Sequence, residues 1–302
     1  MVLNETYTLA NGIEIPKLGF GTWMIEGDAC VQAVKDAIEV GYRHIDTAEG
    51  YGNEREVGKG IRESGVPREQ IFLTTKLEAA YKTYEEAKAG IEKSLADLDL
   101  DYIDLMIIHS PQPWDHFREG DRYFEGNLAA WRALEEAYEA GKVRAIGVSN
   151  FEAEDLDNLI ENGTVKPMVN QILCHISNTP AHLIAACKER GVLVEAYSPV
   201  AHGAVMNNPE AKAVADRLGV SIPRLCIRYC LELGLLPLPK TANPAHMADN
   251  ADVDFAIPAE DMEVLKAAKP ITNYGDGAIF PVYGGKMDDK GNLTARDFVA
   301  RA

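Results

Sequence analysis

The segment Lys17-Leu18-Gly19-Phe20-Gly21-Thr22-Trp23 decides between two α/β folds. Its apolar start predicts a first β-strand over residues 17–21. A doubly wound open sheet normally carries the pattern Gly-x-Gly-x-x-Gly directly after its first strand. The residues found there, 19–23, do not match that pattern. The segment therefore favours a closed barrel over the open sheet.

Working outward from this segment, the same alternation of strand and helix signals continues along the chain. One helical stripe, over 84–98, is opened by the capping box Thr83-x-x-Glu86, and Asn208-Pro209 and Thr179-Pro180 are typical of helix starts. Eight strands alternating with helices in about 250–300 residues predict a (β/α)8 TIM barrel. The seven further strands are expected at residues 43–46, 71–76, 102–109, 143–148, 168–172, 192–197 and 235–238.

The ends of the chain lie outside this alternation. Asn11-Gly12 stands between short alternating runs, which predicts a β-hairpin over 6–16 that covers the barrel floor. We expect the barrel itself over 17–270 and a C-terminal loop and tail over 271–302. Glycine and aromatic residues at the start of this tail suit a loop that crosses the barrel mouth. Residues 1–302 are therefore predicted to form a single barrel domain.

Composition and charge exclude several classes of function. The 302 residues carry a formal net charge of -17, whereas nucleic-acid binding needs clustered Lys and Arg. The sequence has no apolar run of the roughly 18 residues that suggest a membrane span. Residues 1–5 lack the basic and apolar regions of a secretory signal. We therefore expect a cytoplasmic protein that binds neither nucleic acid nor membrane.

The five cysteines are an odd number without Cys-x-x-Cys spacing. Cys226 and Cys230 are four residues apart on a predicted helix, which is compatible with a pair of metal ligands. No nearby His or Cys completes a set of four ligands, so buried free thiols and no metal site are expected. Reduced thiols also agree with a cytoplasmic location.

Polar residues follow three of the predicted strands directly. The second strand ends in Asp46, with Tyr51 in the next loop; the third ends in Lys76 and the fourth in His109. In a barrel of this kind the carboxyl ends of the strands surround one mouth, where active sites lie. Taken alone, each residue has a structural interpretation as a turn, cap, solvated or core residue. Their convergence at one mouth favours a functional site.

The four side chains form a chemically coherent set. A Tyr hydroxyl can act as a general acid if a nearby cation lowers its pKa from about 10. Lys76 can supply that cation, Asp46 can orient Lys76, and His109 can donate a hydrogen bond to a carbonyl oxygen. Such a site would protonate an oxyanion while a hydride is delivered to the carbon.

At these residues the sequence resembles the aldo-keto reductase family along nearly its whole length. The most specific match is residues 41–54, Gly-Tyr-Arg-His-Ile-Asp-Thr-Ala-Glu-Gly-Tyr-Gly-Asn-Glu. It continues through 101–105, His109, Gly147-Val148-Ser149-Asn150-Phe151, 196–199 and 238–241. The resemblance implies that Asp46, Tyr51, Lys76 and His109 are the family's catalytic tetrad. It also implies that Tyr51 donates the proton and that NADPH supplies the hydride.

The resemblance also implies where the cofactor lies. Ser149, Asn150 and Gln171 correspond to the residues that hold the nicotinamide carboxamide, and Tyr197 to the one that stacks on the ring. Ser149-x-x-Glu152 is equally a good capping box for the next helix, so both roles stay open. The complete set of implied cofactor residues is Gly21, Thr22, Ser149, Asn150, Gln171, Tyr197, Ser198, Lys240, Thr241, His246 and Asn250.

The sequence departs from the family pattern at two places. His246 stands where the family has an Arg that contacts the adenosine 2′-phosphate, and a neutral imidazole lacks the charge and fork of a guanidinium. We therefore expect a weakened preference for NADPH, with NADH also used. Ser110 stands where many relatives have Trp, which predicts a wider or more polar substrate pocket; Trp23 and Trp114 are expected as other walls of it.

The leading hypothesis is an enzyme that reversibly reduces an aldehyde or ketone to an alcohol. One alternative is a non-catalytic, cofactor-binding redox sensor or regulatory subunit. Another is an isomerase or lyase that uses Lys76 as a Schiff-base amine, which needs a depressed Lys pKa that Asp46 opposes. The expected partner is a small carbonyl or alcohol substrate, and the expected assembly is a monomer or small homo-oligomer.

Overall fold

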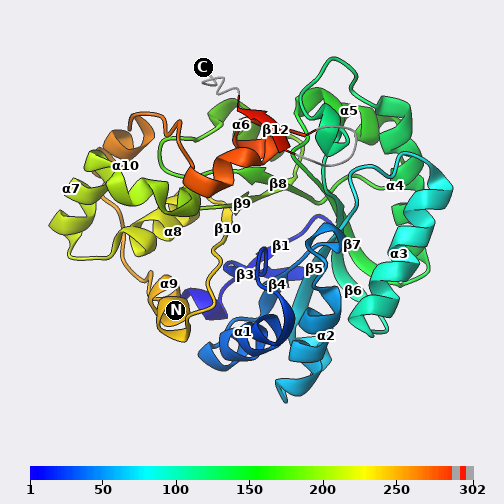
Figure 1. Cartoon of the computed structure of the whole chain (residues 1–302), viewed down its shortest axis with the longest axis horizontal. Helices are drawn as coiled ribbons and strands as arrows, with labels where there is room; N and C mark the ends of the chain where they lie inside the picture. Colours follow the sequence, from blue (N-terminus) through cyan, green and yellow to red (C-terminus); the bar gives the residue numbers. More distant parts are fainter. Residues whose placement is uncertain (288–292, 297–302) are drawn as a thin grey trace.

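The computed structural model describes residues 1–287 and 293–296, and its centre is an eight-stranded parallel sheet (Figure 1). The strands follow one another in chain order from β3 to β10. This sequential order confirms the predicted barrel and shows that the doubly wound alternative is wrong. The strands are β3 (Gly19–Gly21), β4 (His44–Asp46), β5 (Phe72–Leu77), β6 (Ile103–Ile108), β7 (Val143–Ser149), β8 (Val169–Leu173), β9 (Leu193–Tyr197) and β10 (Leu236–Leu238).

Helices alternate with these strands and surround the sheet (Figure 1). Each buries apolar side chains in the core, as expected for amphipathic helices that pack around a barrel. They are α1 (Gly27–Val40), α2 (Glu54–Glu63), α3 (Tyr84–Leu98), α4 (Phe124–Glu139), α5 (Ala153–Asn162), α6 (Ala181–Glu189), α7 (Pro209–Leu218), α8 (Ile222–Glu232), α9 (Pro244–Ala251) and α10 (Ala259–Lys266).

Two of the predicted helix starts are confirmed and one is wrong. Thr83 and Glu86 form the reciprocal capping box of α3, and the Asn208 side chain accepts a hydrogen bond from the backbone N–H of Ala211 in α7. Thr179 does not cap α6. That helix begins one residue later than expected, with Pro180 at the N-cap position and no side-chain cap. The Thr179 hydroxyl instead bonds the hydroxyl of Tyr229 at 2.7 Å.

The barrel closes where β3 meets β10. The backbone N–H of Gly21 donates to the carbonyl oxygen of Pro239 at 2.9 Å. A methyl group placed on Gly19 would lie 2.4 Å from Leu238 Cδ2 and 2.8 Å from His44 Nδ1. The segment 17–23 therefore closes the barrel because glycine leaves room for the last strand to approach.

The N-terminal hairpin forms as predicted. β1 (Thr6–Thr8) pairs antiparallel with β2 (Glu14–Pro16). The Tyr7 hydroxyl donates to the carbonyl of Leu235, just before β10, and Asn11 donates to the carbonyl of Arg144, near the start of β7. Both contacts lie at the amino ends of barrel strands, so the hairpin covers the barrel floor, opposite the mouth.

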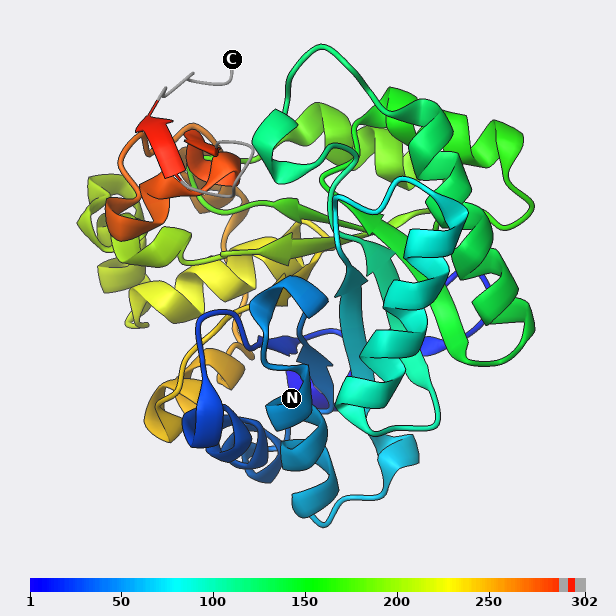
Figure 2. The same ribbon diagram turned by 45° about the vertical axis from the view of Figure 1, so that its right-hand side comes forward.

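The C-terminal segment lies at the mouth (Figure 2). It contains the short helices η6 (Gly275–Ile279) and η7 (Pro281–Tyr283) and the antiparallel pair β11 (Gly285–Met287) and β12 (Leu293–Arg296). The region expected to be loop and tail thus includes short regular elements. Residues 288–292 and 297–302 of that predicted region lie outside the described residues.

The environment of the cysteines and the length and polarity of the helices bear on two predictions from the sequence. All five cysteines are buried and free, which confirms the prediction of buried thiols. Among residues 1–287 and 293–296, no cluster of His, Cys, Asp or Glu could hold a metal ion. Within the same residues, no helix has the length and apolar character needed to cross a membrane.

Candidate active site

The four residues predicted at the strand ends lie together at the barrel mouth. Lys76, at the end of β5, is fully buried, and its Nζ donates to Asp46 Oδ1 at 2.6 Å and to the carbonyl of Thr47 at 2.7 Å. The same ammonium donates to the Tyr51 hydroxyl at 3.3 Å. The rings of Tyr51 and His109 are 5.7 Å apart. A carboxylate, an ammonium, a phenol and an imidazole are therefore in one connected group.

The charges in this group act on Tyr51 in opposite directions. Burial raises the pKa of Tyr51, and Asp46 raises it further, while Lys76 lowers it through its charge and its hydrogen bond. The net pKa lies above the ordinary value of 10.0, so the lowering expected from the sequence does not prevail. The reason is that desolvation disfavours the phenolate more than Lys76 stabilises it. Tyr51 therefore keeps its proton in this state.

Lys76 and His109 hold opposite protonation states. Burial alone would lower the pKa of Lys76, but Asp46 and Tyr51 outweigh it and the pKa is raised. The pKa of His109 is well below its ordinary value because of burial and the Lys76 charge. At neutral pH the site thus presents an ammonium beside a neutral imidazole. The raised pKa of Lys76 also argues against the Schiff-base hypothesis, which needs a lowered one.

A long cavity of about 890 Å³ extends from these residues across the mouth. Tyr51, His109, Trp23 and Trp114 line one end, and the Trp114 ring lies 5.0 Å from the His109 ring. Both tryptophans are therefore where the sequence analysis expects walls of a substrate pocket. The expected cofactor residues that line the remainder are Gly21, Ser149, Asn150, Gln171, Tyr197, Ser198, Lys240, Thr241, His246 and Asn250.

Ser149 and Asn150 are fixed by hydrogen bonds at the end of β7. The Ser149 hydroxyl donates to the carbonyl of Gln171, and Asn150 Nδ2 donates to Ser149 Oγ and to the carbonyl of His109. The Tyr197 hydroxyl donates to Asn150 Oδ1 at 2.8 Å. The capping interpretation of Ser149 is wrong: α5 is capped by Glu152, in a capping box with Asp155.

Gln171 joins the mouth to a buried carboxyl beneath it. Its Nε2 donates to Asp46 Oδ2 and to Glu195 Oε2, each at 2.8 Å. Both amide hydrogens are used, so Gln171 offers a ligand its oxygen, an acceptor. Glu195 is fully buried, and burial together with the Asp46 charge raises its pKa to about 8.

The far end of the cavity carries the cationic side chain expected for a phosphate-bearing cofactor. Lys240 and His246 are exposed there, and Asn250 is buried at the end of the row. Although the Lys240 side chain is exposed, the surrounding protein partly desolvates its ammonium and lowers its pKa. The donor set therefore fits a nicotinamide dinucleotide: an amide and hydroxyl cluster beside Tyr51 at one end, and an ammonium at the other.

Two predicted site residues lie behind the cavity wall rather than in it. Thr22 and Ser110 are fully buried, and neither is among the described residues that line the cavity. The Thr22 hydroxyl donates to the carbonyl of Asp46 at 2.9 Å, which supports β4 instead of facing a ligand. Ser110 is bound through its carbonyl oxygen, which accepts a hydrogen bond from Lys82 Nζ. Its small side chain therefore does not itself form a pocket wall.

Glu78 and His202 also line the cavity, and neither was singled out as a site residue. Phe280 and Tyr283 line it from the C-terminal segment, whose aromatic residues were expected at the mouth. The Tyr283 hydroxyl bonds Ser198 Oγ and, at 2.9 Å, His202 Nε2. Glu78 could have been found, because it is two residues beyond Lys76 and extended backbone places alternate side chains on one face. The contacts of Tyr283 span more than 80 residues and leave no local signal.

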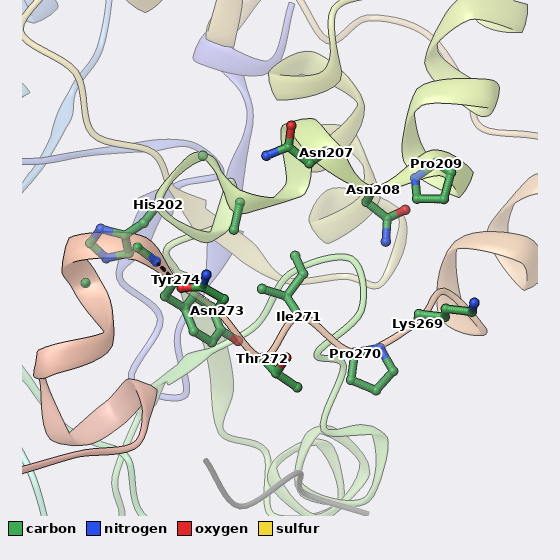
Figure 3. Close-up of a pocket in the computed structure, with 14 residues that line it drawn as sticks. His202, Asn207, Asn208, Pro209, Lys269, Pro270, Ile271, Thr272, Asn273 and Tyr274 are labelled. Atoms are coloured by element: carbon green, nitrogen blue, oxygen red, sulfur yellow. Dashed lines mark hydrogen bonds between the residues drawn. The ribbon is translucent and has the colours of Figure 1, made fainter. Parts of the chain in front are cut away.

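A second hollow, of about 830 Å³, lies beside the mouth (Figure 3). It runs between η5 (Ala201–Asn207), the start of α7 and residues 269–277 of the C-terminal segment. His202 borders both this hollow and the main cavity. Tyr274 lines this hollow, and its hydroxyl bonds His175 Nε2 at 3.1 Å, so His175 anchors the C-terminal segment in the structural role expected for it.

Comparison with known proteins agrees with this fold. The sequence model of the Aldo/keto reductase family matches residues 17–270. Glyoxal reductase from Bacillus subtilis is 40% identical over 267 residues, 88% of this chain and 93% of that protein. Aldehyde reductase YPR1 from Saccharomyces cerevisiae is 36% identical over 287 residues, with 87% and 90% covered.

Solved structures give the same result. MGS-M4, an aldo-keto reductase from a Medee basin deep-sea metagenome library, superposes with a TM-score of 0.81 at 39% identity, covering 87% of this chain and 94% of that one. The Bombyx mori aldo-keto reductase AKR2E4, solved in complex with NADP, superposes with a TM-score of 0.79 at 34% identity, covering 87% and 92%. The chain belongs to the aldo/keto reductase family of oxidoreductases.

Proposed function

We propose that this protein is an NADPH-dependent reductase that converts an aldehyde or ketone to an alcohol, with Tyr51 as the proton donor. The observation that carries the proposal is the Asp46–Lys76–Tyr51 chain, in which Lys76 Nζ lies 2.6 Å from Asp46 Oδ1 and 3.3 Å from the Tyr51 hydroxyl. It opens into the cavity that Trp23 and Trp114 line. Relatives named for glyoxal and aldehyde reduction support the same substrate class.

Each side chain of the group has a defined task in this proposal. A bound reduced nicotinamide supplies hydride to the carbonyl carbon. The Tyr51 hydroxyl gives its proton to the carbonyl oxygen, and the adjacent Lys76 ammonium stabilises the phenolate that remains. Asp46 keeps Lys76 charged and in place. His109, as a neutral imidazole, donates a hydrogen bond that orients the carbonyl oxygen.

Other residues would hold the cofactor. Ser149, Asn150 and Gln171 form a rigid hydrogen-bonded cluster beside Tyr51, suited to a carboxamide. Lys240 offers an ammonium to the phosphate-bearing end. His246 in place of the family's Arg weakens that end for NADPH, so use of NADH remains part of the proposal.

The decisive experiment measures oxidation of NADPH and of NADH with a generic aldehyde by wild-type protein and by Tyr51→Phe. Phe keeps the ring and removes only the acidic hydroxyl, so turnover should fall by about two decades or more while cofactor binding persists. Cofactor binding without turnover in the wild-type protein would point to a regulatory subunit. Borohydride trapping of a substrate on Lys76 would point to Schiff-base chemistry.

A further inference from the structure

One wall of the substrate end carries a carboxylate that the tetrad does not use. Glu78 immediately follows β5 and lines the cavity together with Tyr51, His109 and Trp114. It is two residues beyond Lys76, so the two side chains share the face of the chain that meets the mouth. In the proposed reaction, a charged group at this position would lie next to the substituent on the substrate's carbonyl carbon.

Gly50 brings this carboxylate close to His109. A methyl group placed on Gly50 would lie 2.8 Å from Glu78 Oε2 and 4.0 Å from His109 Nδ1. The imidazole and the carboxylate therefore both border the space beside Gly50. Glu78 fits there because glycine has no side chain. Since His109 is assigned to orient the carbonyl oxygen, Glu78 borders the neighbouring part of the substrate.

The two oxygens of Glu78 have different environments. Oε1 accepts a hydrogen bond from the backbone N–H of Ala79 at 2.9 Å, which fixes the carboxylate plane. Oε2 is the atom that approaches Gly50. Across residues 1–287 and 293–296, no Lys, Arg or His forms an ion pair with Glu78, and the Lys82 ammonium instead bonds Asn127 and the carbonyl of Ser110. The Glu78 carboxyl therefore lines the cavity without a directly paired cation. Burial raises its pKa, while the hydrogen bond from the Ala79 N–H and the more distant Lys82 charge favour the carboxylate.

We propose that Glu78 makes the enzyme selective for uncharged carbonyl substrates and excludes those with a carboxylate next to the carbonyl, the 2-oxo acids. A substrate carboxylate would be placed beside a carboxylate in a partly desolvated pocket, where like charges repel strongly. Uncharged aldehydes and α-dicarbonyl compounds avoid this repulsion. The inference rests on the proposed function and specifies its substrate class.

The test compares two small aldehydes of similar size that differ in charge, neutral glycolaldehyde and anionic glyoxylate. Glu78→Gln preserves an oxygen for the Ala79 hydrogen bond and removes only the charge. It should raise kcat/KM for glyoxylate by about tenfold or more relative to glycolaldehyde. Glu78→Asp, which keeps the charge, should retain the wild-type ratio. Glu85→Gln on the exposed face of α3 makes the same change in net charge and should leave the ratio unchanged.

A binding measurement separates this inference from the proposed function. Trp23 and Trp114 line the cavity, so quenching of their fluorescence reports glyoxylate binding without turnover. Glu78→Gln should bind glyoxylate about tenfold more tightly than the wild-type protein. If the wild-type protein does not turn over glycolaldehyde, that result contradicts the proposed function but not the role of Glu78. Unchanged glyoxylate binding, or equal changes for both substrates, overturns the role of Glu78.

Discussion

Replacing Glu195 by Gln should change how the stability of the protein depends on pH. Glu195 is fully buried under the mouth, and its pKa is raised from 4.5 to about 8 by burial and by Asp46. The unfolded chain releases this proton near pH 4.5, whereas the folded protein retains it up to about pH 8. Between these values the folded state binds more protons, so stability falls as pH rises.

The size of the stability change follows from the pKa shift of Glu195. At about 1.4 kcal/mol for each pKa unit, raising the pH from about 5 to about 8 removes up to about 4 kcal/mol from the folding free energy of the wild-type protein. In the Glu195→Gln variant the new amide would still offer an oxygen to Gln171 Nε2, but it has no proton to lose. The variant should therefore gain stability relative to wild type as pH rises through this range. His44 Nε2 lies 3.9 Å from Glu195 Oε1. Burial lowers the pKa of His44 to about 3, so the imidazole is neutral throughout this pH range and its own titration adds little to the difference between the proteins.

The assay is urea unfolding followed by tryptophan fluorescence at about pH 5, about pH 6.5 and about pH 8, with both proteins measured in parallel. Glu85→Gln, at an exposed position, serves as the control and should show no pH-dependent difference from wild type. If the difference in unfolding free energy between Glu195→Gln and wild type stays constant across this range, Glu195 does not retain a proton in the folded protein. The reasoning about its buried carboxyl would then be refuted.

Three further outcomes are expected. His246→Arg should tighten NADPH binding by about one to two decades without a comparable effect on NADH, because it restores a charge-assisted contact; fluorescence titration with both nucleotides measures this, and equal effects on both would contradict it. Gly58→Ala should destabilise the fold by about 1–3 kcal/mol or more, since the added methyl would lie 1.9 Å from the carbonyl oxygen of Leu98, whereas Lys59→Ala on the same helix should be nearly neutral in thermal unfolding. The cysteines should react with a thiol reagent only on unfolding because all are buried; fast labelling of the native protein would argue against the packing described.

The barrel and the position of Asp46, Tyr51, Lys76 and His109 at its mouth could be predicted because their signals are local. The strands of a parallel barrel are buried on both faces, so each appears in the sequence as a short, mostly apolar run. β6, from Ile103 to Ile108, is an example. A polar residue that ends such a run must lie at the mouth, which places Lys76 and His109 without knowledge of the tertiary structure. The motif match at residues 41–54 then indicated their shared chemistry.

Other features depend on contacts that no local pattern reveals. Ser149-x-x-Glu152 has the spacing of a capping box, but Ser149 is the last residue of β7. The helix α5 starts only at Ala153, with Glu152 as its cap. The raised pKa of Tyr51 could not be foreseen either. The sequence shows the cation beside it but not the depth of burial, and burial has the larger effect. Glu195 likewise stands in an otherwise apolar strand, and only the barrel interior pairs it with Gln171.

The Tyr283 hydroxyl ties together two segments that line the cavity. Its bonds to Ser198 and His202 attach the C-terminal segment to the loop that follows β9, and in the proposed function these two segments would contact different ligands. Neither segment can swing outward without breaking those bonds or taking the other with it. If the proposed function holds, departure of the alcohol and exchange of the nucleotide should share a common mechanical step, and a change that speeds one should speed the other.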